Sequence, residues 1–171
     1  MHKISNYIVN YCLENNVNHI IVGLNKGWKK KVNNGKQNNQ NFLNIPHSLL
    51  IQYIDYKSKL NGIKFVLQEE SYTSKVDSLA LEKLPNFDDV YKNNNSNNRD
   101  KTLNPLTNIK YLGKRVKRGL FQSSIGKIIN ADINGSLNIL RKYLKSKSKQ
   151  DSLIEKILCS GRVFRPVKIY I

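Results

Sequence analysis

The sequence has little cysteine and no long apolar run. Its two cysteines, Cys12 and Cys159, lie far apart in a chain of 171 residues, and neither belongs to a Cys-x-x-Cys pair. A disulfide framework and a structural zinc site are therefore not expected, and a reducing compartment is favoured. The chain does not open with a basic segment followed by an apolar core, which excludes a visible secretory signal and predicts a cytoplasmic protein. No apolar run reaches the roughly 18 residues that a transmembrane helix needs.

Acidic residues are also scarce. The chain has 12 Asp and Glu against 29 Lys and Arg, which gives a formal net charge of +17. Such an excess favours a polyanionic partner, because neutralising phosphates releases their counterions. A membrane surface is the competing partner, but the basic residues are not confined to one amphipathic helix. We therefore expect DNA or RNA as the partner, and no membrane. The 39% hydrophobic content predicts one globular unit.

Four regular elements are predicted in the first 75 residues. Apolar spacing indicates helices over residues 4–15 and 45–62, and β-branched runs indicate strands over 19–24 and 63–70. Residues 25–44 form a basic, polar loop without periodicity. A strand, a helix and a second strand make a βαβ unit with parallel strands and a right-handed crossover.

The remaining sequence divides into three parts. Residues 76–110 contain the low-complexity tract "YKNNNSNNRD", which predicts a flexible insertion. Residues 111–145 hold a basic, glycine-containing loop and then a helix over 130–145, with Asn130 as its N-cap. We expect one buried apolar face on this helix, and the tail at 146–171 to add at most a short strand. The apolar face comprises Ile133, Leu137, Leu140 and Leu144.

Three carboxylates are candidates for chemistry. Glu69 and Glu70 stand where the second strand ends, and ligands in open α/β sheets bind beyond the carboxyl ends of strands. Asp132 lies in the first turn of the last helix, followed by the small residues Gly135 and Ser136. Carboxylates from separate elements are what magnesium-dependent phosphodiester cleavage requires. The alternatives are a solvated strand end for the glutamates and a favourable helix-dipole contact for Asp132.

Basic residues are candidates for binding a phosphate backbone. The segment "GKRVKRGLF" carries Lys114, Arg115, Lys117 and Arg118, and its glycines allow close approach; a solvated loop is the alternative. Trp28, followed by Lys29 and Lys30, stacks on a base or anchors its loop to the core. The three histidines show no metal-ligand spacing; they are His2, His19 and His47.

Five ordered blocks carry a resemblance to a known family. They are "VGLNKGWKK", "NFLNIPHSLL", "YKSKLNGIKFVLQEESYTSK", "GKRVKRGLF" and "INADINGSLNILRKY". In this order they resemble the C-terminal half of the OrfB/TnpB proteins of bacterial insertion sequences, and in particular the subgroup that closes on "GKR…RGL…NADxNGxxNI". The resemblance covers about residues 3–145. It implies an RNase H-like (RuvC-like) endonuclease domain that cuts DNA under RNA guidance with Mg²⁺ or Mn²⁺.

The resemblance also assigns roles to residues. Asp132 matches the third acidic position of the nuclease site. Gly23 stands where most members carry the second glutamate, so Glu70, or less favourably Glu69, takes that role. Val76 and Ser78 stand near the position of the family's zinc-ribbon cysteines, so no zinc is expected. The metal ligands expected here are Glu70 and Asp132.

The resemblance further predicts an incomplete nuclease. The family's first catalytic aspartate lies in a "DxG" context on a strand that would precede the first helix here, and its recognition and wedge domains lie further towards the N-terminus. We therefore expect an α/β, partial RNase H-like fold that lacks its N-terminal strands and is inactive alone. A full-length relative, a separately encoded N-terminal part or a guide-type RNA would be its partner. The alternatives are a non-catalytic basic nucleic-acid-binding protein and a decayed open reading frame.

Overall fold

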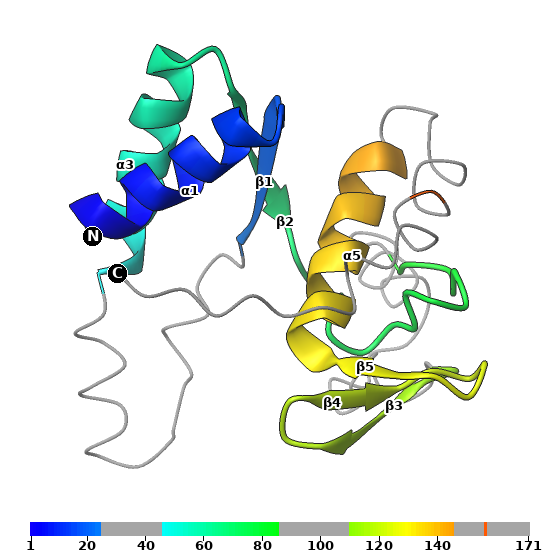
Figure 1. The fold of residues 1–171 in the computed structure, drawn as a ribbon. Coiled ribbons are helices and arrows are strands. Elements are labelled where there is room, and N and C mark those ends of the chain that lie inside the picture. Colours follow the sequence, from blue (N-terminus) through cyan, green and yellow to red (C-terminus); the bar gives the residue numbers. More distant parts are fainter. Residues whose placement is uncertain (25–45, 86–109, 146–155, 157–171) are drawn as a thin grey trace, which may run out of the picture. The chain divides into compact units, whose positions relative to one another are not determined.

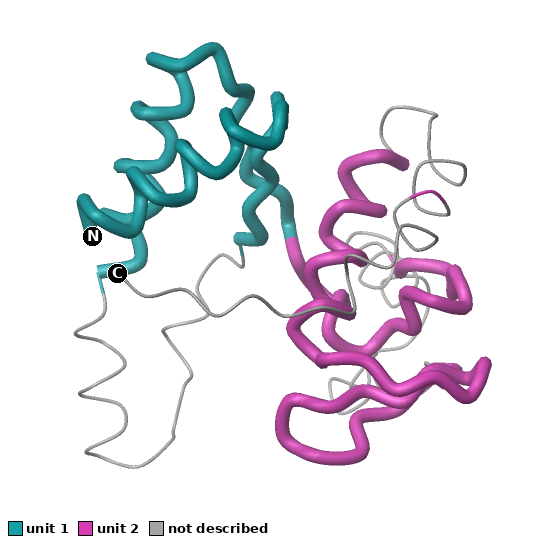
Figure 2. Tube along the Cα trace, viewed as in Figure 1, with its two compact units in different colours: residues 1–69, 168–171 teal, residues 70–167 magenta. Residues whose placement is uncertain are grey.

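The described residues fall into two compact units. A computed structural model describes residues 1–24, 46–85, 110–145 and Lys156 of the chain (Figure 1). Residues 1–69 contribute the first unit, and the second unit begins at Glu70 (Figure 2). The hydrophobic content predicts one globular unit, whereas the contacts within the chain separate two compact units. The boundary predicted at residue 75 lies within the second unit. None of the described helices is long and apolar enough to cross a membrane.

The first unit is a βαβ arrangement preceded by a helix, as the sequence predicts. Its two strands pair in parallel, with His19 opposite Lys64 and Leu24 opposite Glu69. Figure 1 shows the two helices side by side. The elements are α1 (His2–Glu14), β1 (His19–Leu24), α3 (His47–Leu60) and β2 (Lys64–Glu69). Gly62 follows α3 with a φ of +69°, a conformation that suits glycine at a helix end.

A small apolar cluster holds this unit together. Val9 and Cys12, one turn apart on α1, pack with Ile63 and with the half-buried Ile20 of β1. Burial raises the pKa of the Cys12 thiol, so the side chain is protonated and behaves as a small apolar group at neutral pH. The spacing of apolar residues on α1 thus positions the helix against the strands.

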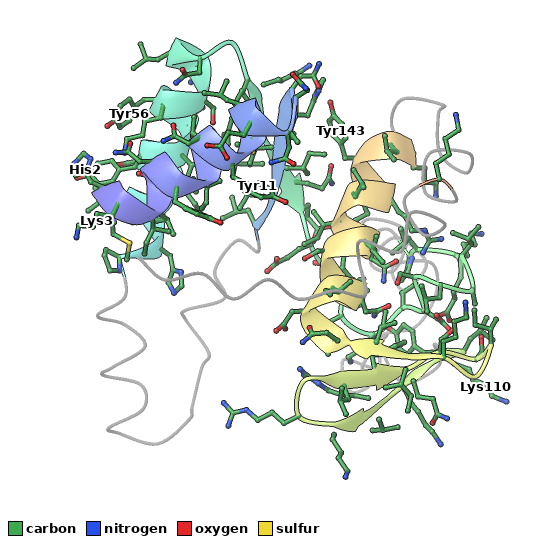
Figure 3. The ribbon with its side chains drawn as sticks, viewed as in Figure 1. His2, Lys3, Tyr11, Tyr56, Lys110 and Tyr143 are labelled. Carbon is green, nitrogen blue, oxygen red and sulfur yellow. The ribbon has the colours of Figure 1, made fainter. Side chains whose placement is uncertain are left out.

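A buried lysine joins α1 to α3. The Lys57 ammonium donates hydrogen bonds to the Ser5 hydroxyl over 2.6 Å and to the His2 carbonyl over 3.1 Å. It also lies 5.7 Å from the ring centroids of Tyr53 and Tyr56, and the ring of His2 stacks on Tyr53 at 4.0 Å. His2 and Tyr56 are labelled in Figure 3. Hydrogen bonds and aromatic faces stabilise this buried charge.

The second unit contains a sheet that the sequence does not predict. A loop is predicted over residues 111–127, but seven of them belong to two strands of an antiparallel sheet of order β3-β4-β5. Its elements are β3 (Lys114–Lys117), β4 (Leu120–Gln122) and β5 (Ile128–Asn130), followed by α5 (Ala131–Lys145). The strands have only three or four residues, and the register shifts between Arg115 and Lys117. Such short, irregular and charged strands lack the alternation that marks a strand in a sequence.

The buried face of α5 also differs from the prediction. Leu137 and Leu144 are buried as expected, but Ile133 and Leu140 are only half-buried. The helix buries several polar residues instead, namely Asn134, Asn138 and Arg141, at 0%, 0% and 4% exposure. The polar residues follow the 3.6-residue period as regularly as the apolar ones do. A prediction from apolar residues alone therefore assigns the wrong buried face to α5.

The predicted insertion at 76–110 is wrong for its first ten residues. Val76, Asp77 and Ser78 are completely buried, and Leu84 is 4% exposed. Asp77 and Ser78 are held by hydrogen bonds rather than by periodic apolar contacts, which explains why a composition argument misses this segment. Residues 86–109 of the insertion lie outside the described residues. So do the loop at 25–44 with Trp28, Lys29 and Lys30, and the tail at 146–171 apart from Lys156.

Candidate nucleic-acid interface

An exposed basic hairpin is the main candidate site. We use "basic hairpin" for β3, β4 and the turn between them, with the cations Lys114, Arg115, Lys117 and Arg118. All four of these cations are exposed to solvent. Gly119 closes the turn with a φ of +79°, which glycine adopts without strain. The structure thus brings the four predicted phosphate-binding residues together on one short segment.

The electrostatics of this segment are one-sided. Residues 110–131 contain six Lys and Arg residues and no Asp or Glu. Lys110, at the start of the segment, is also exposed (Figure 3). Exposed cations without acidic neighbours in sequence give a positive field to which a phosphate backbone is complementary.

The strand register separates two faces of the sheet. Lys114, Gln122 and Ile128 lie opposite one another on adjacent strands, so their side chains share one face. Ile128 is 56% exposed, whereas its neighbour Ile129 is 4% exposed and packs with Phe121. One face thus builds the core of the second unit. The other face presents lysine and aliphatic side chains to solvent.

A buried carboxylate fixes the sheet to the preceding loop. Asp77 accepts hydrogen bonds from the Ser123 hydroxyl over 2.8 Å, and from the backbone N–H and the hydroxyl of Ser124 over 2.7 and 2.9 Å. It also accepts the N–H groups of Leu79 and Ala80. Burial alone would raise the pKa of Asp77, but the bonds from Ser124, Ser123 and Ala80 outweigh it and lower that pKa.

Two asparagines of α5 hold the same loop. Asn134 accepts the Ser78 N–H over 3.0 Å and donates to the Val76 carbonyl over 2.9 Å. Asn138 donates to the carbonyls of Thr73 and Val76 over 2.9 and 2.7 Å. Val76 and Ser78 are the positions where the resemblance would allow cysteines, and here their backbone groups bind to α5.

Arg141 and Glu82 extend this network. Arg141 donates to the Asn138 side-chain oxygen and to the Glu82 carbonyl, each over 2.7 Å. The Glu82 carboxylate accepts the N–H of Asp77 over 2.7 Å and the N–H of Leu112 over 3.0 Å. Sequence reasoning missed these residues. Their signal was the recurrence of polar residues at the positions Asn134, Asn138 and Arg141 of an otherwise buried helix.

The candidate metal ligand Asp132 is exposed at the start of α5. Asn130 caps this helix as predicted, because its side-chain oxygen accepts the N–H groups of Asp132 over 2.8 Å and of Ile133 over 3.3 Å. The space above Gly135 is open, since an added Cβ would meet no atom within 4 Å. The carboxylate therefore stands in an accessible first turn, where both a metal role and a helix-dipole role are chemically suitable.

Glu70 is connected to α5 through the turn that follows it. The Glu70 carbonyl accepts the N–H of Thr73 over 3.2 Å and its hydroxyl over 2.8 Å, and Thr73 is bound by Asn138. Asn138 follows Asp132 by six residues, which is about 9 Å along a helix axis. A shared ion thus requires the half-buried Glu70 side chain to extend towards the N-terminus of α5. Glu69 is exposed at the end of β2 in the first unit.

The described residues contain no group of three or more His, Cys, Asp or Glu side chains arranged to hold a metal ion. The donor set of Glu70 and Asp132 consists of carboxylate oxygens, which suit Mg²⁺ or Mn²⁺ chemically. The assignment of both residues stays a prediction.

Comparison with known proteins identifies the family. The described residues define a mixed α/β protein with a basic hairpin fixed to a polar helix. Residues 47–139 match the family model described as Cas12f1-like, TNB domain. The match spans more than half of the chain, so the chain belongs to this family. This match supports a TnpB/Cas12-type relation, and the sequence motifs indicate the TnpB side of it. No curated protein matches the sequence.

Proposed function

We propose that the chain binds nucleic acid through the phosphate backbone, with the basic hairpin as the contact surface. The observation that carries this proposal is the exposure of Lys114, Arg115, Lys117 and Arg118 on one hairpin without an acidic residue between positions 110 and 131. Contacts of this kind are independent of sequence and weaken with salt, because each neutralised phosphate releases counterions. The net charge of +17 supports the same partner. Membership in the Cas12f1-like, TNB domain family supports it further.

The test is the salt dependence of binding. A variant with Lys114, Arg115, Lys117 and Arg118 all changed to Gln should bind duplex DNA more weakly, and its slope of log K against log salt should flatten by about 0.9 for each phosphate that the variant no longer neutralises. The matched control changes four exposed lysines elsewhere to Gln and removes the same charge. These are Lys3, Lys64, Lys83 and Lys145. An equal change in the two variants would show that net charge acts and not the hairpin.

We further propose that the chain is the C-terminal part of a RuvC-like, metal-dependent DNA endonuclease of insertion-sequence origin, with a partial RNase H-like fold. The order of the five sequence blocks supports this proposal. The match over residues 47–139 supports it also, since it includes both Glu70 and Asp132. In this proposal Glu70 and Asp132 hold Mg²⁺ or Mn²⁺, which orients the attacking water and stabilises the leaving oxygen. The partners are DNA and a guide-type RNA, with a full-length relative or a separately encoded N-terminal part.

Two carboxylates are fewer than such a site needs. A site of these two carboxylates alone compensates the charge of the metal ions incompletely and holds the reacting water poorly. We therefore propose that the chain binds nucleic acid by itself but cleaves only when a further segment completes the site. The competing functions are a non-catalytic nucleic-acid-binding protein and a product without selected activity. A cleavage assay with and without such a segment separates the first of these from a nuclease.

A further inference from the structure

An aromatic and basic cluster adjoins the basic hairpin. The Lys75 ammonium lies 5.9 Å from the centre of the Tyr111 ring, a cation–π distance. Tyr72 lies on the same turn as Lys75, since its carbonyl accepts the Lys75 N–H over 3.0 Å. Burial raises the pKa of Tyr111, and Tyr72 and Glu82 raise it further, as expected for ionisable groups close to its hydroxyl. We call Tyr72, Lys75 and Tyr111 the tyrosine cluster. Lys75 is exposed, and both tyrosines are half-buried.

The backbone at Tyr72 is unusual. Its φ is +67°, in the left-handed region that bulky side chains rarely adopt. The surrounding turn holds it there, because Thr73 bonds to the Glu70 carbonyl and Val76 donates to the Tyr72 carbonyl over 3.3 Å. Glycine would take this conformation without strain. The chain instead places a bulky aromatic residue here, three positions before Lys75, and strained residues of this kind occur mostly at functional sites.

Tyr111 is fixed at the start of the basic hairpin. The N–H of the next residue, Leu112, donates to the Glu82 carboxylate over 3.0 Å. Gly113 then passes so close to Phe121 that an added Cβ would lie 2.5 Å from its ring. These two contacts fix the path of the chain between the Tyr111 ring and Lys114, the first residue of β3. Because Glu82 also accepts the Asp77 N–H, its negative charge is already hydrogen-bonded.

We propose that the tyrosine cluster stacks an unpaired base of a single-stranded nucleic acid whose phosphates contact the basic hairpin. This inference rests on the proposed function of the hairpin and adds the class of substrate. Aromatic rings next to cations bind single strands in this way, because every base has a π-face and an adjacent phosphate. A duplex keeps its bases paired and stacked, so the cluster gains nothing from it. The site therefore favours a single strand over a duplex.

The test compares one labelled 20-nucleotide DNA as a single strand and as a duplex, with fluorescence anisotropy and the full 171-residue chain. Tyr111→Ala should weaken single-strand binding roughly 10-fold, the effect of losing one base stack, and leave duplex binding unchanged. Tyr111→Phe should bind as the unaltered chain does. Tyr11→Ala is the matched control, because Tyr11 is 48% exposed and lies on α1 in the first unit. An RNA single strand of the same sequence shows whether the sugar matters.

Two further measurements make the result decisive. Tyr111→Leu keeps an apolar side chain without a π-face, so it replaces Tyr111→Ala if circular dichroism shows that the alanine variant is unfolded. A 2-aminopurine base in the single strand should change its fluorescence on binding, and this change should disappear in Tyr111→Leu. If the Tyr111 variants weaken single-strand and duplex binding equally, or weaken neither, the proposed base stacking is overturned. The proposed role of the basic hairpin would then still stand. Absence of salt-dependent binding by the unaltered chain would overturn both.

Discussion

The carboxylate of Asp77 accepts the backbone N–H of Ser124 over 2.7 Å, across 47 positions of sequence. This bond connects the loop after Val76 to the turn between β4 and β5, where the N–H of Ser123 donates to the Lys127 carbonyl. The basic hairpin is therefore positioned by a buried anion rather than by a large apolar core. The stability of the second unit should depend on the charge of that anion.

Acid should destabilise the second unit through Asp77. Its hydrogen bonds lower its pKa in the folded state below the ordinary value of 3.8. The stability that the charge contributes is therefore complete above about pH 4 and is lost as the pH falls through the lower, folded-state pKa. Asp77→Asn should lower the free energy of unfolding by about 2–3 kcal/mol at pH 7. The side-chain NH₂ group of the asparagine would then face the N–H and O–H donors that the carboxylate now accepts. The variant should also flatten the dependence of Tm on pH between 5 and 2, measured by circular dichroism.

The control for Asp77 is Asp55→Asn. Asp55 pairs with Lys59 on the surface of α3 over 2.8 Å, and the Lys59 side chain is 70% exposed. Such pairs contribute about 0–1 kcal/mol, so this variant should keep nearly all of the stability at pH 7. If the two variants lose stability equally, the buried network around Asp77 does not hold the unit.

Asn138→Ala should destabilise the second unit strongly. The change leaves the buried carbonyls of Thr73 and Val76 without this donor and removes the oxygen that Arg141 bonds. An unsatisfied buried polar group costs about 1–3 kcal/mol, so we expect a loss of about 2–4 kcal/mol in urea denaturation. Ser136→Ala, at an exposed position of the same helix, is the control and should change stability by about 0.5 kcal/mol or less.

Two glycines of the second unit should respond to alanine with opposite signs. A Cβ at Gly113 would lie 2.5 Å from the ring of Phe121, which is 1% exposed and cannot move freely. Gly113→Ala should therefore cost about 1–3 kcal/mol through overpacking. A Cβ at Gly135 meets nothing within 4 Å, and alanine favours the helix, so Gly135→Ala should add about 0.5–1 kcal/mol. Thermal melts of the two variants that shift in the same direction would contradict this assignment.

The sequence predicts the first unit better than the second for a physical reason. In the first unit, apolar periodicity and β-branched runs correctly predict the helices and strands. The buried face of α1 nevertheless comprises Ser5, Val9 and Cys12, so it is not purely apolar. In the second unit, Asn134 and Asn138 are buried because their amides satisfy backbone groups of a loop that follows β2 directly. A pattern of apolar residues contains no information on such long-range hydrogen bonds.

The candidate site shows the same limit. The four cations of the basic hairpin could be predicted because charge is read directly from the sequence. The tyrosine cluster could not, because Tyr111 meets Lys75 only once the intervening residues fold. Whether Glu70 and Asp132 share an ion depends on the reach of the Glu70 side chain along α5, and neither spacing nor composition determines that reach.

The open edge of β1 should make the chain self-associate. Among the described residues, β1 pairs only with β2, and its residues Ile20, Ile21 and Val22 carry no charge. Parallel strands normally lie inside larger sheets, and uncharged edges recruit other strands. Light scattering should show a mass that rises with concentration. Ile21→Lys should reduce it if circular dichroism confirms folding, whereas Leu60→Lys, at a position 79% exposed on α3, should not. If Leu60→Lys reduced the mass and Ile21→Lys did not, exposed apolar side chains and not the β1 edge would cause the self-association.

Cleavage should require a further segment. With Mg²⁺ or Mn²⁺, the chain alone should leave DNA intact, because Glu70 and Asp132 provide too few ligands for a two-metal reaction. Adding in trans a segment with the aspartate-bearing strand of a relative should cover the β1 edge and start cleavage. Asp132→Asn should then abolish cleavage, and the control Ser136→Ala should not. Of Glu70→Gln and Glu69→Gln, the variant that loses cleavage identifies the glutamate of the site. Cleavage by the chain alone that Asp132→Asn removes would refute the incomplete site. No cleavage with any such segment would favour the non-catalytic binding protein.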